Sequence, residues 1–129
     1  MQRFEEHGIL LAIASISEPI KEGTQFITSN HHDIQVGTWK YNAGKKLNSH
    51  YHKDNERSIT RTQEFIYVKK GKIKCLVYGL DSVLINSFVL SEGDYATFFN
   101  GGHGYEFIED SEVIEVKCGE FNYDDKVRI

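Results

Sequence analysis

Short segments in which apolar and polar residues alternate, each bounded by turn residues, follow one another along most of the chain. In the segment 72–78, Ile73, Cys75 and Val77 fall on one face of a strand, opposite two lysines. A period of two is typical of a strand in a sheet with one solvent-facing side. Helical periodicity is nearly absent, so we predict an all-β fold, either a sandwich or a closed barrel.

We expect nine or ten short strands in a single domain of 129 residues. The expected strands cover residues 9–16, 23–27, 34–41, 47–52, 64–68, 72–78, 83–90, 95–99, 103–108 and 113–118. We assign N-terminal strands to residues 1–33, the barrel core to residues 34–118 and a tail to residues 119–129. Residues 1–8 are expected to form an irregular lead-in, and residues 53–60 a polar loop.

The charge distribution argues against binding to nucleic acid. The formal net charge is −4, and acidic and basic residues are mixed along the chain. The two basic clusters, Lys45-Lys46 and Lys69-Lys70, both fall in predicted turns. We therefore expect no nucleic-acid partner.

The apolar run near the N-terminus, Ile9 to Ile13, is too short to span a membrane. Two glutamates precede it, where a signal peptide would carry basic residues. We expect no membrane partner and a cytoplasmic location. Cys75 and Cys118 sit at apolar positions of predicted strands, so we expect buried free thiols and no disulfide framework.

Three histidines and one glutamate fall on three separate predicted strands in a pattern that suits a metal site. His50 and His52 are separated by one residue, so both imidazoles would point to the same face of a strand. Glu64 and His103 each open a further predicted strand. Nitrogen and carboxylate ligands suit Fe, Mn, Co, Ni or Zn, and the sequence does not choose among them. We therefore predict one divalent metal ion, with water completing its ligand shell.

The stretch that contains the first of these residues resembles the first motif of the cupin superfamily. That motif reads G, five residues, H-x-H, three or four residues, E, six residues, G. Here Gly44 is followed after five residues by His50-Tyr51-His52, and Glu64 is followed after six residues by Gly71. The spacing departs from the motif between His52 and Glu64, where eleven residues intervene.

The stretch GDYATFFNGGHGYEF resembles the second cupin motif through Gly93, Gly101 and His103. Phe99 stands where the motif has proline, and Phe107 stands where it has asparagine. The resemblance implies a double-stranded β-helix, a small jelly-roll barrel, with the four predicted ligands in its mouth. More narrowly, the C-terminal run resembles that of small single-domain bacterial cupins associated with surface-polysaccharide and sugar biosynthesis, which implies a setting but no reaction.

Other residues are candidates for the site. Glu56 has the usual motif spacing from His52, but no strand and no glycine follow it at the right distance, so we favour Glu64. Tyr105 would share the inward face of His103 and can donate a hydrogen bond to a ligand. Arg57 and Arg61 lie in the loop between the ligand strands, where a guanidinium can hold a carboxylate or phosphate bidentately.

Glu115 and Lys117 share one face of the last predicted strand, either as a pocket pair or as an exposed ion pair, and we favour the exposed pair. The aromatic residues suggest a homodimer. Phe65 and Tyr67 face away from Glu64 on their strand, and the pair at positions 39 and 41 is also aromatic. Outward aromatic side chains need a cover, which a second subunit or the N-terminal strands would provide.

These features support several functions. The first is a metalloenzyme that acts on a small polar substrate, which we take to be sugar-derived. The second is a non-catalytic module that binds or senses a small sugar-like molecule. The third is a metal-free sugar isomerase or epimerase that uses His50 or His52 as its base. The sequence assigns no catalytic residue and no reaction type, because one fold hosts many chemistries.

Overall fold

The computed structural model describes residues 1–120, 122, 124 and 126–129, and the all-β prediction is confirmed. Its strands are β1 (Gln2–Glu6), β2 (Ile9–Ser15), β3 (Gly23–Phe26), β4 (Gly37–Lys40), β5 (Glu64–Lys70), β6 (Lys72–Tyr78), β7 (Leu84–Ser91), β8 (Tyr95–Phe98), β9 (Gly102–Phe107) and β10 (Glu112–Lys117).

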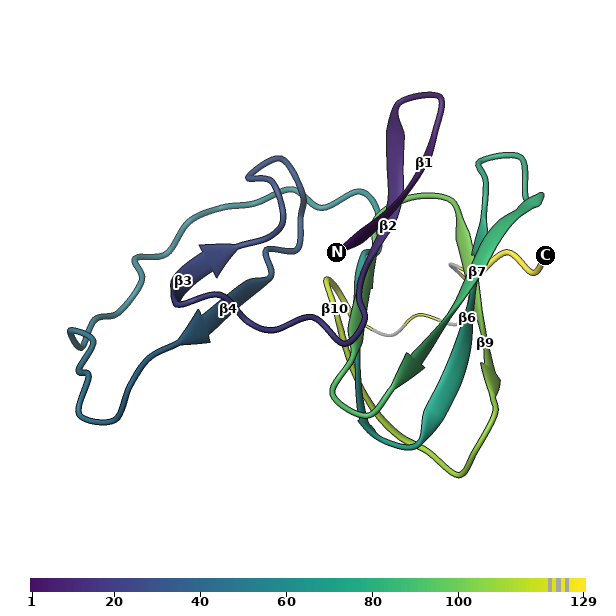
Figure 1. Ribbon diagram of the computed structural model, residues 1–129. Coiled ribbons are helices and arrows are strands. Elements are labelled where there is room, and N and C mark those ends of the chain that lie inside the picture. The colour runs from purple at the N-terminus through teal and green to yellow at the C-terminus, as the bar shows by residue number, and fades with distance from the viewer. Residues whose placement is uncertain (121, 123, 125) are drawn as a thin grey trace.

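These strands form three antiparallel sheets (Figure 1). A five-stranded sheet has the order β1-β2-β8-β5-β10, and a three-stranded sheet has the order β7-β6-β9. The two remaining strands, β3 and β4, pair with each other. The tight turn at Gly71 carries the chain from β5 into β6 and so joins the two larger sheets.

The two larger sheets enclose one hydrophobic core, to which both contribute every second residue. In β5 the inward positions are Glu64, Ile66 and Val68, and in β6 the buried residues alternate in the same way. The packed core consists of Phe4, Leu11, Ala12, Ala14, Ile66, Val68, Ile73, Cys75, Val77, Phe88, Leu90, Ala96 and Phe98. Burial of these apolar faces is what drives the two sheets together. We call this body, made of β1, β2 and β5–β10, the sandwich.

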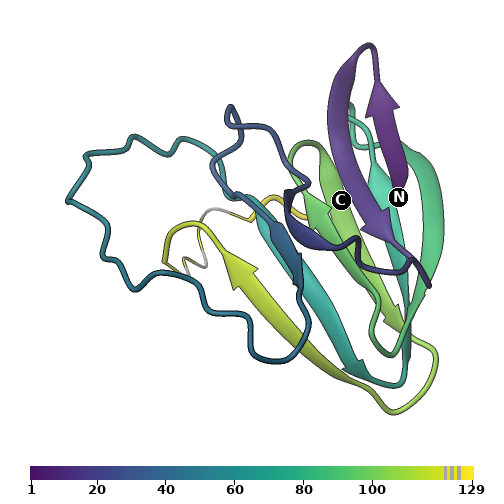
Figure 2. The same ribbon diagram turned by 60° about the vertical axis from the view of Figure 1, so that its left-hand side comes forward.

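Residues 16–63, between β2 and β5, form a separate feature that we call the arm. It contains the β3–β4 hairpin, which pairs with no other described strand. Residues 41–62 then run as a long irregular segment around the outside of the hairpin and return to the sandwich near the start of β5 (Figures 1 and 2). The arm therefore extends away from the hydrophobic core.

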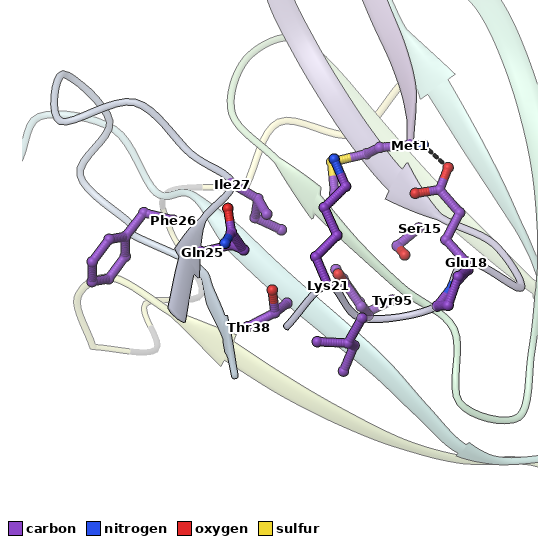
Figure 3. Close-up of a pocket in the computed structure, with 11 residues that line it drawn as sticks. Met1, Ser15, Glu18, Lys21, Gln25, Phe26, Ile27, Thr38 and Tyr95 are labelled. Carbon is purple, nitrogen blue, oxygen red and sulfur yellow. Dashed lines mark ion pairs between the residues drawn. The ribbon is translucent and has the colours of Figure 1, made fainter. Parts of the chain in front are cut away.

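The arm contacts the sandwich near its start and again in its middle. The backbone N–H of Ser17 donates to Asp94 Oδ1 at 2.7 Å, and the His32 ring stacks on Phe99 with centroids 4.2 Å apart. Between the arm and the five-stranded sheet lies a cavity of about 230 Å³ (Figure 3). Its wall includes Ser15 and Tyr95 from the sandwich. The arm is thus incompletely packed against the sheet that it covers.

Two expectations about the strands were wrong. Residues 1–8 are not an irregular lead-in, because Gln2–Glu6 pairs with β2 through a turn in which His7 and Gly8 adopt positive φ. Residues 47–52 form no strand and are exposed. Their sequence offers a single large aliphatic side chain, Leu47, and the arm places no neighbouring strand beside it.

The predictions for the outward positions of β5 and for the thiols agree better with the structure. Phe65 and Tyr67 lie opposite the buried face of β5, as expected. Cys75 is a buried free thiol, as expected, whereas the free thiol of Cys118 is only partly buried because it lies just beyond the end of β10. Within the described residues no helix is long and apolar enough to cross a membrane.

Candidate functional site

The sequence-predicted residues Glu64 and His103 meet at one end of the sandwich, which we call the mouth. Glu64 is the first residue of β5 and pairs across the sheet with Phe98 on one side and Lys117 on the other. His103 lies on β9 opposite the buried Val77. Because alternation turns both side chains inward, residues far apart in sequence face each other across the core.

Glu64 and His103 are in direct contact. His103 Nε2 lies 2.7 Å from Glu64 Oε2, and the side chains are 29% and 10% exposed respectively. The Phe98 ring packs beside the imidazole, with ring centroids 4.8 Å apart. A short carboxylate–imidazole hydrogen bond in a half-enclosed place fixes the orientation of the ring.

The environment keeps Glu64 ionised. The hydrogen bond from His103 is the largest influence and lowers the pKa of Glu64, whereas burial acts in the opposite direction. The positive charges of His103, Lys117 and Lys126 lower this pKa further. The net direction is downward, so Glu64 is a carboxylate at neutral pH and can stabilise a positive charge on the histidine.

Tyr105 places a third polar group at the mouth. It follows His103 by two residues on β9, so it shares the inward face, as predicted from the sequence. Its hydroxyl is buried close to the Glu64 carboxylate but makes no hydrogen bond of ordinary geometry with any described residue. Burial is the largest influence that raises the pKa of Tyr105, and the charge of Glu64 adds to it, so the phenol stays protonated. A buried hydroxyl without a partner is unfavourable, and a bound ligand would relieve it.

The two candidate arginines differ in their surroundings. The Arg61 side chain contacts Asn100 Oδ1, close in sequence to the turn that leads into β9 and His103. Arg57 is exposed in the arm, and the described part of the chain gives it no ion pair. Arg61 is therefore the arginine that the fold anchors near the mouth.

His50 and His52 lie in the irregular part of the arm. Their rings contact each other, with centroids 5.1 Å apart, and His50 Nδ1 donates a hydrogen bond of 3.0 Å to the carbonyl oxygen of Asn48. Both are exposed. The four predicted metal ligands are thus brought together as two pairs, one in the arm and one at the mouth. The competing candidate, Glu56, is also exposed in the arm.

Within a single chain the fit to a metal ion is therefore incomplete. Among residues 1–120, 122, 124 and 126–129, no group of three or more His, Cys, Asp or Glu side chains is placed to hold a metal ion. The mouth alone offers one imidazole and one carboxylate, whereas protein metal sites of this kind use three or four ligands. The four-ligand site remains a prediction, and we assign no chemical step to a metal.

Sequence reasoning weighed Lys117 as a pocket residue but favoured the other reading. We expected an exposed pair with Glu115, but the register of β10 pairs Lys117 with Glu64, and its charge acts on that carboxylate. The charge of Lys126, from the tail, acts on Glu64 too. The sequence does not show that Lys117 pairs with Glu64, because the pairing joins strands that are far apart along the chain.

No family model matches this chain, and neither does any curated protein or solved structure with which it was compared. The function must therefore be argued from the residues at the mouth. They provide a carboxylate held ionised, an imidazole oriented by it, and a buried phenol without a partner.

Proposed function

We propose that the mouth binds a small polar molecule and that His103, oriented by Glu64, transfers a proton on that molecule. The observation that carries this proposal is the 2.7 Å contact between His103 Nε2 and Glu64 Oε2 in a half-enclosed setting. An imidazole titrates near neutrality, and a carboxylate hydrogen-bonded to one ring nitrogen stabilises the imidazolium that forms when the other nitrogen accepts a proton.

Isomerisation or epimerisation is the reaction class that uses such a pair without any other reactant. His103 takes a proton from a carbon next to a carbonyl and returns it to a neighbouring atom on the same face, or to the same carbon after the bound intermediate has turned over, so atoms and charge balance over the cycle. Glu64 remains ionised throughout and holds the ring in place. The base differs from our sequence prediction, since His50 and His52 lie in the arm.

Two further groups suit a sugar-derived ligand. The unpartnered Tyr105 hydroxyl can donate to a carbonyl or hydroxyl oxygen of the ligand. Arg61, which the fold anchors near the mouth, can hold a carboxylate or phosphate on the same molecule. We therefore propose a polar, anionic, sugar-derived substrate and retain the cupin-type double-stranded β-helix as the proposed form of the sandwich. Two observations support that form: two sheets enclose one core, and the turn glycines Gly71 and Gly93 both have positive φ.

The proposal is tested by screening sugar acids and nucleotide sugars against the purified protein, by calorimetry for binding and by proton exchange in NMR for chemistry. His103→Asn should abolish solvent exchange at the reacting carbon while the ligand still binds. The control is His31→Asn, which changes an exposed arm histidine. Exchange that persists in His103→Asn would overturn the assignment of the base.

Tyr105→Phe should weaken binding about tenfold, or 1.4 kcal/mol, because it removes one donor to the ligand. Tyr67→Phe, on the outward face of β5, is the matched control and should leave affinity unchanged. Binding of the ligand without any chemical change would instead support the non-catalytic binding or sensing module. Retention of full activity after exhaustive chelation would show that the chemistry is metal-free.

A further inference from the structure

We propose that the end of the tail, residues 126–129, forms part of the rim of the mouth, where Lys126 binds the anionic group of the ligand and Ile129 holds Lys126 in place. The inference rests on the proposed function, because it takes the mouth as the binding site of a polar, anionic molecule. It deepens that function by naming residues that distinguish an anionic ligand from a neutral one.

The first observation is where the tail begins and ends. Lys117, the last residue of β10, pairs with Glu64 in the five-stranded sheet. At the other end, Ile129 contacts Gly102, the first residue of β9 in the three-stranded sheet. Figure 1 shows the C-terminus beside that sheet. Because Glu64 pairs with Lys117 and His103 follows Gly102, the tail begins on one side of the mouth and ends on the other.

The second observation is that Ile129 occupies the space left by a missing side chain. A Cβ added to Gly102 would collide with Cδ1 of Ile129, and it would lie 3.2 Å from Cβ of Tyr78. The backbone itself does not require glycine here, because Gly102 is not among the glycines with positive φ. Glycine within a strand often marks a place of close approach by another group. The start of β9 is therefore shaped to receive Ile129.

The third observation is that this contact brings a positive charge from the tail to the mouth. Lys126 precedes Ile129 by three residues, and its charge is one of those that lower the pKa of Glu64. Such an effect requires that the two groups lie close together, because salt screens exposed charges beyond about 8 to 10 Å. Ile129 thus fixes the end of a segment whose lysine acts at the mouth.

The fixed charges of the described residues at the mouth leave one positive charge in excess. The cations are Arg61, Lys117 and Lys126, and the carboxylates are Glu64 and Glu115, the second of which acts on Tyr105. With His103 counted as neutral, three cations face two carboxylates. Without Lys126 the charges would balance. The tail therefore supplies the charge that attracts an anion to the mouth.

Neutralising Glu64 does not by itself account for Lys126. His103 Nε2 already lies 2.7 Å from the Glu64 carboxylate, and Lys117 pairs with Glu64 across the sheet. Lys126 is exposed and lies beyond the last strand, so its ammonium group can meet an entering ligand without disturbing either sheet. A lysine in this place is suited to a phosphate or carboxylate group as a point charge.

Calorimetry tests the inference, with glucose 1-phosphate and glucuronate as anionic probes and glucose as the neutral probe. Lys126→Gln should weaken binding of both anions about fivefold, because it removes one solvent-exposed charge pair, and should leave the affinity for glucose unchanged. The difference from the wild type should shrink in about 0.5 M NaCl, which screens exposed charges.

The matched control is Arg128→Gln, which removes the same charge two positions further along the tail. Arg128 is not one of the residues whose charge lowers the pKa of Glu64. The control should therefore leave all three affinities unchanged.

Ile129→Ala tests the positioning role. It keeps Lys126 but removes the contact with Gly102, so it should weaken anion binding about threefold, because the lysine is then less ordered before the ligand binds. The control is Val127→Ala, which trims a side chain that is 90% exposed and should have no effect. Lys126→Gln combined with Ile129→Ala should bind anions no more weakly than Lys126→Gln alone, since Ile129 acts only through Lys126.

Two glycine variants test the same contact from β9. Gly102→Ala places a methyl group against Ile129, whereas Gly104→Ala places one no closer than 3.5 Å to Leu76. The first should weaken anion binding as Ile129→Ala does, and the second should not. The ratio of anion affinity to glucose affinity is the readout, because a general loss of folded protein lowers both affinities together.

Equal weakening by Lys126→Gln and Arg128→Gln would overturn the inference, because it would show that the tail acts only through its total charge. An unchanged ratio in Lys126→Gln, or a wild type that binds both anions no better than glucose, would overturn it too. None of these results bears on proton exchange at His103. Failure of this inference is therefore distinguishable from failure of the proposed function.

Discussion

The sandwich and the arm both contain β-strands, but these strands differ in what surrounds them. In the sandwich, strands such as β6 have neighbours on both sides, and their apolar residues are buried in alternation. In the arm, the β3–β4 hairpin has no third strand among the described residues, and its large side chains are exposed. The comparison shows that strand pairing alone forms a hairpin, whereas burial of its apolar side chains requires a second sheet packed against it.

The predicted site residues are also divided between the sandwich and the arm. Glu64 and His103 are fixed at the mouth by the register of strands that pack into the core, and their contact follows from that register. His50 and His52 lie where no register exists, so they interact mainly with their own segment. Positions in the sandwich should therefore be sensitive to substitution, and chemically matched positions in the arm should tolerate it.

The largest difference is expected for matched isoleucines. Ile73→Ala removes a fully buried side chain of β6 and should lower the free energy of unfolding by about 2 to 5 kcal/mol, because it leaves a cavity. Ile59→Ala, in the exposed loop of the arm, should change it by less than about 0.5 kcal/mol. Urea unfolding followed by tryptophan fluorescence and circular dichroism compares the two. Equal losses would mean that the arm is packed as firmly as the sandwich.

Two turn glycines give the next contrast. Both Gly71 and Gly44 adopt positive φ, 83° and 86°, which disfavours a side chain by about 1 to 2 kcal/mol. At Gly71 an added Cβ would also collide with the backbone of Asp110 and Ser111, whereas at Gly44 it meets no described atom within 4 Å. Gly71→Ala should therefore destabilise by about 2 to 4 kcal/mol and Gly44→Ala by no more than about 2 kcal/mol.

Thermal unfolding of both glycine variants at one protein concentration measures this difference. A Gly44→Ala variant as unstable as Gly71→Ala would indicate that the arm turn is closely packed against a neighbour.

A smaller, pH-dependent difference is expected for two glutamates. The pKa of Glu64 is lowered in the folded state, so its contribution to stability is present above the ordinary glutamate pKa of 4.5 and is lost as the pH falls through the folded value. Glu64→Gln should lower stability at pH 7 by about 1 to 3 kcal/mol, and the gap from the wild type should close in acid.

Glu56→Gln, in the arm, is the control and should follow the wild type at every pH. Denaturant unfolding between pH 3 and pH 8 gives the two curves. A gap for Glu64→Gln that widens toward acid would contradict the direction assigned to the pKa of Glu64.

The smallest expected difference is in the reactivity of the two thiols, and it involves no change in stability. Burial raises the pKa of Cys75 to about 12, so this thiol should not react with a disulfide reagent at pH 8 until the protein unfolds. Cys118 is partly exposed and contacts the root of the arm, where its Sγ accepts a hydrogen bond of 3.1 Å from the backbone N–H of Gln63. It should react in the native protein. Absorbance of the released thiolate counts the fast and slow groups, and two equally fast thiols would show that the core opens readily.

The sequence by itself determined the all-β class and most strand positions of the sandwich. Alternation in segments such as Lys72–Tyr78 dictates which residues are buried, since each face of a strand has one environment. The same alternation predicted that Tyr105 shares the inward face of His103. These are local properties, set by neighbours one or two positions away, and so they can be predicted from the sequence alone.

Only the tertiary structure decided which of these residues meet. The contact of Glu64 with His103 and the approach of Lys117 to the same carboxylate both depend on strand order and register. The separation of His50 and His52 from the mouth is likewise a property of the arm as a whole. Pairings between distant segments depend on loop closure and on competition among all available strands, which no local pattern records.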